Sequence, residues 1–555
     1  MPWPFSPKYP ERTPEYANED EYDYIIIGGE TSGCVLASHL SSSTTQKILL
    51  LERGPTNDTY LSRISLLSSN IYSPSSGAKS WFCSPMKHCN DRESLVFRAE
   101  LLGGGSRVNN EVYTRGTKGD YEEWKEMGCE GWGWKDVEPY FQRMEKIVGE
   151  DVKEAERVRK GNAGAMCYEI FWLLKTENET PISILFFRKK LLLSENFFLT
   201  ICTNTTVHRI EFSDDDGIPL ASEAIFGSSD STSTKTFEAK VKKEVIICSG
   251  ALGSPQVLML SGIGPRQHLE EHKIKFIHDL PGVGSNFTDH PSTPVAWEIP
   301  ISESIIQVAV SPLKAILEFG NFFIRSQSLS EDATGPHIKD SSSPNIEPTP
   351  TETSPLQPSN SQNLVPDIEL IPLAVSAMDD MEEHRSTFSK IGVFCILAVI
   401  CSPLYRGSVR LTSPSPHSFP AVDFGIFSNP SDMILALSFG KTMLSSGFPL
   451  LRPVTFSSVS QDLDVENGNL EEMDNFIRHG VRNTFHYSST CRMGSETDEN
   501  YPGVVDNELR VHGVKGVRIG DASVFPKIVS HHTMAPAAMV ATRCAGFVVD
   551  AQNIS

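Results

Sequence analysis

The first clear pattern along the chain is a short apolar run at residues 24–27, enclosed by an aspartate and a pair of glycines. An uninterrupted apolar run of this length is typical of a buried strand. Residues 32–40 follow with the spacing of a helix, and residues 47–51 form a second apolar run. Two such strands joined by a helix predict a βαβ unit, and therefore a parallel sheet with helices against it.

The later part of the chain shows a different pattern. The spacing of Trp, Tyr and Glu within residues 119–146 predicts helices, whereas residues 325–364 are dominated by Ser, Pro, Thr and Asn without periodicity. Such a composition predicts a long loop or a disordered insert. Beyond it, residues 367–371, 392–399 and 407–411 read as strands of a second domain. The chain is thus predicted to have an α/β fold in which the second domain carries its own sheet.

Length and charge restrict the possible functions. The 555 residues suggest two large domains, or one domain with a substantial insertion. The formal net charge is −21. Because a nucleic-acid partner requires a cationic surface, this charge argues against nucleic-acid binding.

The cysteines and the apolar segments indicate a cytoplasmic protein. Eleven cysteines are scattered without a CxxC pair or a Cys/His cluster at metal spacing, so we expect reduced thiols and no metal site. The first 20 residues contain prolines and acids where a secretory signal would have a basic start and an apolar run. The longest apolar stretch, residues 391–401, has about half of the ~20 residues that a membrane span requires. We therefore expect neither export nor a membrane partner.

The turn of the βαβ unit carries a candidate nucleotide site. Residues 28–33 read GGETSG where a dinucleotide fold has GxGxxG, and Glu52 closes the second strand nineteen positions after Gly33, where an acid would bind ribose hydroxyls. Position 30 should lack a side chain so that the backbone can approach a pyrophosphate. Glu30 adds bulk and negative charge there, which should weaken binding. An ordinary βαβ connection would give the same pattern, so this motif alone does not decide.

Further segments point to one family. Residues 99–109 read AELLGGGSRVN and residues 250–264 read GALGSPQVLMLSGIG. Near the C-terminus the segments FHYSSTCRMG, GDAS and HTMAP begin at Phe485, Gly520 and His532, and GVGSNFTDH begins at Gly282. Together these segments resemble the signatures of the glucose-methanol-choline (GMC) oxidoreductases, with Glu100 where the family has a basic or amide residue.

The resemblance runs from about residue 22 to about residue 549 and implies the domain organisation. It implies a Rossmann-like FAD-binding domain over residues 20–295, an antiparallel-sheet substrate domain over residues 296–480, and a C-terminal part, residues 481–555, that completes the FAD domain and the active site. Residues 150–200 are shorter than the matching family segment and do not align.

The resemblance also implies the cofactor and its ligands. The cofactor would be FAD, bound noncovalently because Val108 stands where some relatives attach it through a histidine. Asp521 would lie near the ribityl and pyrophosphate portion, although a helix N-cap would explain it equally well. Val207 would contact the adenine through its backbone. The implied cofactor-binding residues are Gly28, Thr31, Ser32, Gly33, Glu52, Gly104, Ser106, Asn109, Val207, Asp521 and Ala522.

His486 and His532 occupy both positions at which the family has its active-site pair. Oxidation of an alcohol by a flavin requires removal of the hydroxyl proton as hydride leaves the carbon, and an imidazole suits that step. His486 is therefore the expected general base, and His532 the expected donor to the substrate oxygen. His531 is adjacent, but the sequence that follows sets the register on His532.

The expected function is FAD-dependent oxidation of a small alcohol in secondary metabolism, with dioxygen or a quinone as electron acceptor. Two alternatives remain open: a lyase resembling the cyanohydrin-cleaving members of the family, and a catalytically impaired relative, which Glu30 and the shortened segment suggest. A secreted biomass-degrading enzyme is disfavoured by the lack of a signal sequence.

Overall fold

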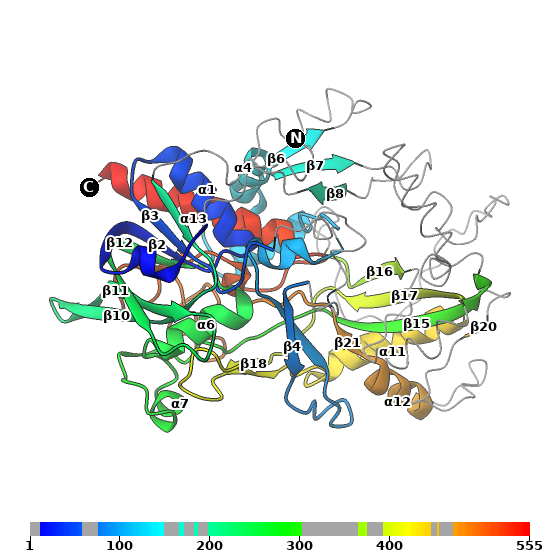
Figure 1. Cartoon of the computed structure of the whole chain (residues 1–555). Helices are drawn as coiled ribbons and strands as arrows, with labels where there is room; N and C mark the ends of the chain where they lie inside the picture. The colour runs from blue at the N-terminus through cyan, green and yellow to red at the C-terminus, as the bar shows by residue number, and fades with distance from the viewer. Residues whose placement is uncertain are drawn as a thin grey trace.

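The computed structural model describes residues 11–57, 71, 76–110, 112–148, 166–170, 183–186, 198–301, 365–373, 392–445, 452–453 and 470–554. The predicted insert at residues 325–364 and most of the divergent segment near residues 150–200 lie outside the described residues. Two large sheets dominate the fold, and Figure 1 shows them in different parts of the molecule.

The first sheet is built on the predicted βαβ unit. Strands β2 (Asp20–Ile27) and β3 (Ile48–Leu51) are parallel neighbours, and α1 (Thr31–Ser43) connects them. On the far side of β2 lies β12 (Thr236–Ile247), also parallel to it. The last four residues of β2 and all four of β3 are buried, because helices cover the faces of a parallel sheet. This burial explains the uninterrupted apolar runs in the sequence.

The C-terminal segment contributes a strand to the same sheet. Strand β22 (Val517–Ile519) runs parallel to β12 although about 270 residues separate them in the chain. The long helix α13 (Met534–Ile554) packs against α1 and α4 (Trp134–Met144), as Figure 1 shows. A domain formed from both ends of the chain is what the resemblance implies, while the boundaries themselves stay a prediction.

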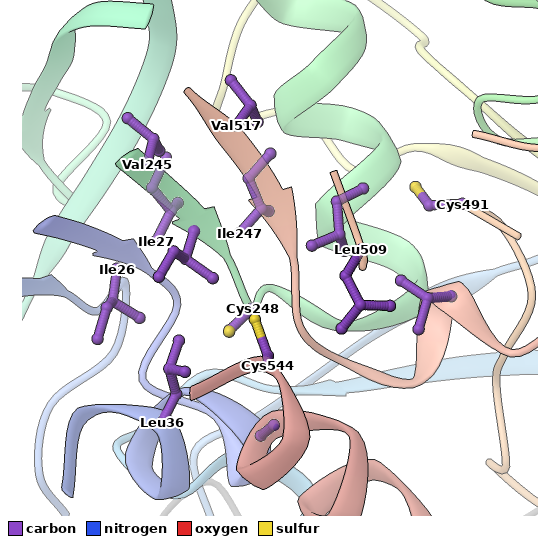
Figure 2. Close-up of a cluster of buried hydrophobic side chains, with 14 of the residues drawn as sticks. Ile26, Ile27, Leu36, Val245, Ile247, Cys248, Cys491, Leu509, Val517 and Cys544 are labelled. Atoms are coloured by element: carbon purple, nitrogen blue, oxygen red, sulfur yellow. The ribbon is translucent and has the colours of Figure 1, made fainter. Parts of the chain in front are cut away.

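The buried side chains of this region form one continuous core. Figure 2 shows Ile26 and Ile27 of β2, Leu36 of α1, Cys248 and Cys544 within one cluster of buried side chains. All five are at most 4% exposed. Full burial of one large aliphatic side chain contributes about 1.5–3 kcal/mol, so this core holds the glycine turn that follows β2 in a fixed position.

The second sheet is antiparallel, as predicted for the substrate domain. Strand β17 (Gly392–Ile400) lies between β15 (Pro291–Ile299) and β16 (Ile368–Leu373). Helices α11 (Pro430–Ser445) and α12 (Leu470–Gly480) contact β15. These findings confirm the predicted fold class, an α/β domain of Rossmann type with an antiparallel-sheet domain beside it.

One predicted strand pairs differently from the expectation. Residues 407–411 do contain a strand, β18 (Ser408–Arg410), but it pairs with β19 (Ala421–Asp423) in a separate ribbon. Hydrogen bonds of Val409 to Gly284 and of Gly407 to Phe287 tie this ribbon to the loop before β15. Local alternation predicts that a strand exists, but not its partner.

The remaining strands extend the two large sheets or form smaller sheets. The predicted helices at residues 119–146 are α3 (Lys118–Glu126) and α4 (Trp134–Met144). The others are β1 (Glu11–Arg12), β4 (Ala78–Phe82), β5 (Leu95–Ala99), β6 (Glu145–Val148), β7 (Met166–Ile170), β8 (Ser183–Phe186), β9 (Leu199–Cys202), β10 (Thr205–Asp215), β11 (Ile218–Ser228), α6 (Gly250–Leu260), β13 (Ile263–Gly264), α7 (Arg266–Glu271), β14 (His278–Asp279), β20 (Arg452–Pro453) and β21 (Arg482–Asn483), with 3-10 turns η1 (Pro14–Ala17), η3 (Gly104–Arg107) and η6 (Ala522–Val524).

Helix α13 is long and apolar enough to cross a membrane. Its apolar window is Met534–Ala551, and 67% of that window is buried inside the protein. Within the described part of the chain it is the one helix with this property. Burial of this extent is expected of a core helix.

Candidate active site

The turn after β2 requires glycine at two of the predicted positions. Gly28 has a φ of 99°, and a Cβ atom there would lie 2.5 Å from the carbonyl oxygen of Cys248. A Cβ atom on Gly33 would lie 1.9 Å from the carbonyl oxygen of Gly28. Both distances are shorter than any real contact, so side chains are excluded and α1 can begin directly against the strand.

Glu52 holds this turn and keeps free acceptor sites. Its two carboxylate oxygens accept hydrogen bonds from the backbone amides of Gly29 and Gly54, each at 2.7 Å. Burial raises the pKa of Glu52, while these two amides lower it. An ionised carboxylate has about four acceptor sites, so roughly two remain for the hydroxyl groups of a ribose.

A pocket opens beside Glu52. Its wall includes Gly28 from the turn and Val207 from β10, so it unites residues that are far apart in the sequence. Ser249, Gly253 and other residues of the loop and helix that follow β12 close another side. The predicted ribose and adenine contacts therefore share one cavity.

The glycine-rich segment at residues 103–109 lies against this turn. The Thr31 hydroxyl donates to the carbonyl of Gly103 and accepts from the amide of Ser106, both at 3.3 Å. A Cβ atom on Gly104 would lie 2.7 Å from the Cβ atom of Glu30. The two glycine-rich segments are therefore in direct contact.

Two of the predicted cofactor residues contact α13 through their side chains. The Ser32 hydroxyl donates to the carbonyl of Ala537 at 3.1 Å, and the Asn109 amide lies 3.1 Å from the sulfur of Met534. Both side chains therefore hold α13 against the glycine-rich segments.

Asp521 sits at the meeting point of two short backbone segments. Its carboxylate accepts from the amide of Gly250 at 2.9 Å, from the hydroxyl of Ser254 at 2.5 Å and from the amide of Ser523 at 2.8 Å. The last bond caps the 3-10 turn η6, which begins at Ala522. Burial raises the pKa of Asp521, and the hydrogen bonds lower it. Asp521 is therefore the N-cap of η6, as the alternative interpretation states. It also lies beside the turn at residues 28–33.

The side chain of Glu30 intrudes into this arrangement. It precedes the first residue of α1 but makes no capping hydrogen bond. Its Oε2 atom would lie 2.7 Å from a Cβ atom placed on Gly250. Burial raises the pKa of Glu30 to about 8, and the nearby acids Glu52 and Asp521 add to this rise. The turn at residues 28–33, the acceptor Glu52 and the pocket therefore fit a dinucleotide. The carboxyl group of Glu30 lies among them.

The two predicted catalytic histidines meet directly. Nε2 of His486 lies 3.1 Å from Nδ1 of His532, with the rings edge to face. Burial lowers the pKa of His532 to about 4 and that of His486 well below its usual range. The His532 ring also lowers the pKa of His486. Both imidazoles are therefore neutral near pH 7.

A third histidine fixes which nitrogen atoms carry protons. Nε2 of His290 lies 3.1 Å from the carbonyl oxygen of Cys401, which can only accept, so Nε2 is protonated. Burial and the charge of His532 lower the pKa of His290 to about 3, so His290 is neutral and its Nδ1 accepts. The partner of that nitrogen is Nδ1 of His486, 2.9 Å away, which must donate.

The proton position on His290 determines those on His486 and His532. Because Nδ1 of His486 carries the proton, its Nε2 is unprotonated and accepts from Nδ1–H of His532. One backbone carbonyl thus sets His486 as a base and His532 as a donor on their facing sides.

A buried carboxylate positions the loop that carries His486. Asp289 accepts from the backbone amides of His290 and His486, both at 2.8 Å, and from that of Thr484 at 3.2 Å. Burial raises the pKa of Asp289 to about 7, although these hydrogen bonds lower it. The hydroxyl of Tyr405 donates to the Asp289 carbonyl at 2.5 Å. The histidine loop is therefore held by groups from several segments.

A glutamate lies on the other side of His532. Glu369 on β16 places Oε1 3.7 Å from Nε2 of His532, and its side chain is 15% exposed. Its Oε2 has no hydrogen-bond partner among the described residues. Burial raises the pKa of Glu369, while His531 lowers it. Since His532 is neutral near pH 7, the two groups are not a permanent ion pair.

Three of these residues are not among the predicted site residues. Asp289 and His290 lie within the GVGSNFTDH segment, whose adjacent acid and histidine are the local signal for them. Glu369 lies in a predicted strand, and nothing in the local sequence indicates which way it faces.

Comparisons with known proteins agree with this geometry. Residues 22–167 and 192–292 match the N-terminal family model of the GMC oxidoreductases, and residues 403–541 match the C-terminal one. The dehydrogenase pkfF of Emericella nidulans is 27% identical, over 95% of this chain and 93% of that protein. The oxygen-dependent choline dehydrogenase of Photobacterium profundum is also 27% identical, over 95% and 93%. The structure of an FAD-dependent oxidoreductase from Chaetomium thermophilum superimposes with a TM-score of 0.75 at 21% identity, over 96% of this chain and all of the other.

The fold and the site define a flavin-dependent oxidoreductase that acts on CH–OH groups. Because the two family models cover well over half of its length, the chain belongs to the GMC oxidoreductase family. Its cofactor is FAD.

Proposed function

We propose that the protein removes a hydride from the alcohol group of a small organic molecule, with His486 as the general base. The observation that carries this proposal is the 3.1 Å contact between an unprotonated Nε2 of His486 and a protonated Nδ1 of His532. An acceptor and a donor that face each other in this way can bind the two sides of one hydroxyl group.

The substrate hydroxyl replaces the direct hydrogen bond between the two rings, which must move apart to admit it, because 3.1 Å between the nitrogens leaves no room for an oxygen atom. Its proton is then donated to Nε2 of His486, and its lone pair accepts from Nδ1–H of His532. As the proton moves to His486, negative charge grows on the oxygen, and the fixed donor of His532 stabilises it. Nδ1 of His290 accepts from His486 and thereby stabilises the imidazolium that forms.

FAD supplies the hydride acceptor when it is bound. Gly28 and Gly33 would allow the backbone to approach its pyrophosphate, Glu52 would hold the ribose, and Val207 would line the adenine site. Because Val108 cannot form a bond to the flavin, we infer noncovalent binding.

Separate observations support the electron acceptor, the compartment and the pathway. Dioxygen or a quinone would reoxidise the flavin, and an oxygen-dependent choline dehydrogenase among the relatives supports dioxygen. Ten described cysteines are free and buried, which supports a cytoplasmic location. Similarity to a fungal dehydrogenase supports a role in secondary metabolism.

Anaerobic mixing of the FAD-loaded protein with alcohols tests the proposal. Choline and benzyl alcohol serve as probes of two alcohol classes, and a wider set of primary and secondary alcohols extends them. Bleaching of the flavin by an alcohol is expected in the wild type and should be slowed strongly in His486→Ala. Turnover without bleaching would instead favour lyase chemistry.

A further inference from the structure

The carboxyl group of Glu30 lies where the two glycine-rich segments converge. We propose that Glu30 binds the pyrophosphate of FAD directly, and only in its protonated form, so that one proton enters the pocket together with the cofactor. This inference rests on the proposed function, because it assumes that FAD is the cofactor.

The geometry places Glu30 among the expected phosphate ligands. Its Cβ atom is against Gly104, its Oε2 atom is against Gly250, and it lines the same pocket as Gly28 and Glu52. It also stands at the N-terminus of α1, where unpaired backbone amides attract an anion. The carboxyl group therefore lies beside the position that a phosphate group takes in a dinucleotide fold, within reach of its oxygens.

The charges around Glu30 are mostly negative. Four charged groups lie close enough to shift its pKa: Glu52 after β3, Asp521 before η6, Arg98 on β5 and Glu100 after β5. The thiols of Cys34 and Cys248 are also near, and Arg53 lines the same pocket. Arg98 and Arg53 already bind Glu100. Few cations remain to offset a pyrophosphate, so an ionised Glu30 would repel it.

Protonation removes the repulsion and creates a donor. A neutral carboxyl group has one O–H, which can donate to a phosphate oxygen, as a backbone amide does. The pKa of Glu30 is already raised to about 8 without a cofactor, by burial first and then by Glu52 and Asp521. The negative charge of bound FAD must raise it further.

The direction of the pH effect follows from these two states. Below about pH 8 Glu30 is protonated before FAD binds, so binding takes up no proton at this site. Above about pH 8 the free protein has lost the proton and must regain it, so affinity falls about tenfold for each pH unit.

Isothermal titration calorimetry of the FAD-free protein with FAD tests the inference. At pH 8.5–9, titrations in two buffers of different ionisation enthalpy report the number of protons taken up. We expect uptake approaching about one proton in the wild type and almost none in Glu30→Gln, which keeps a donor but cannot ionise. Glu126→Gln is the control, because Glu126 is an exposed acid on α3 that does not line the pocket, so its replacement should not change the uptake.

The outcomes separate this inference from the proposed function. Binding of FAD by the wild type with no more proton uptake than Glu30→Gln would overturn the role of Glu30 and leave the function intact. Binding by Glu30→Gly alone, with none in the wild type at any pH, would also overturn it, because Glu30 would then only block the site. If no variant binds FAD, the proposed function fails as well.

Discussion

Removal of His290 should weaken the catalytic base without touching the substrate. His290 accepts a hydrogen bond from Nδ1 of His486 at 2.9 Å and is held by the Cys401 carbonyl at 3.1 Å. When His486 takes the substrate proton, this bond becomes charge-assisted. Such bonds contribute about 1.5–3 kcal/mol, which corresponds to about 10- to 150-fold in rate.

The structure places the expected loss near the lower end of that range. The hydroxyl of Thr484 lies 3.2 Å from the same nitrogen of His486 and offers a second acceptor. We therefore expect His290→Leu to reduce the anaerobic rate of flavin reduction about tenfold. His290→Asn is the matched control, because its side-chain oxygen can replace Nδ1 as the acceptor, and it should recover most of the loss.

The pH profile distinguishes this effect from general damage. An acceptor bonded to the imidazolium raises the pKa of His486, so its removal should lower that pKa and move the acid limb of the rate profile to lower pH. Stopped-flow measurements over a pH series would show both effects. Unchanged rates in His290→Leu, or equal losses in His290→Leu and His290→Asn, would refute the proton assignment along the histidine row.

Three further outcomes are expected. His486→Ala should keep FAD bound but lower the rate of flavin reduction by about 10² or more in stopped-flow assays, as loss of a general base does; an unchanged rate would remove His486 from the mechanism. Gly33→Ala should lose FAD and unfold at a lower temperature, because its Cβ atom would lie 1.9 Å from the Gly28 carbonyl oxygen; calorimetry and a flavin-occupancy measurement that match the wild type would contradict this. In the FAD-free protein, the folded-state pKa of Glu30 is raised from 4.5 to about 8, so its contribution to stability is complete below pH 4.5 and is lost as the pH rises to 8. Glu30→Gln should therefore gain thermal stability relative to wild type between these pH values, and a constant difference would contradict the raised pKa.

The sequence predicted those parts of the fold that local periodicity encodes. The apolar run at residues 24–27 and the glycines after it predicted β2 and its turn, because a buried parallel strand needs continuous apolar residues and a tight turn needs Gly28. The same signals could not assign β18, because strand pairing depends on segments that are distant in the chain. The resemblance supplied His486 and His532, but it gave neither their separation nor their protonation.

The missed residues share one property. His290 and His486 are 196 positions apart, and no local pattern reports that their ring nitrogens lie 2.9 Å from each other. Glu369 lies in a predicted strand, but its direction depends on how that strand packs. In contrast, the conflict at Glu30 was visible in the sequence, because the steric demand of a dinucleotide turn applies to a single position.

The most direct measurement is the visible spectrum of the purified protein after incubation with FAD at pH 7 and gel filtration, before and after anaerobic addition of an alcohol. We expect the bands of oxidised flavin to remain with the protein and to bleach when an alcohol that fits the pocket is added. A colourless protein, in both the wild type and Glu30→Gly, would contradict flavin-dependent alcohol oxidation. So would bound flavin that stays oxidised with every alcohol tested.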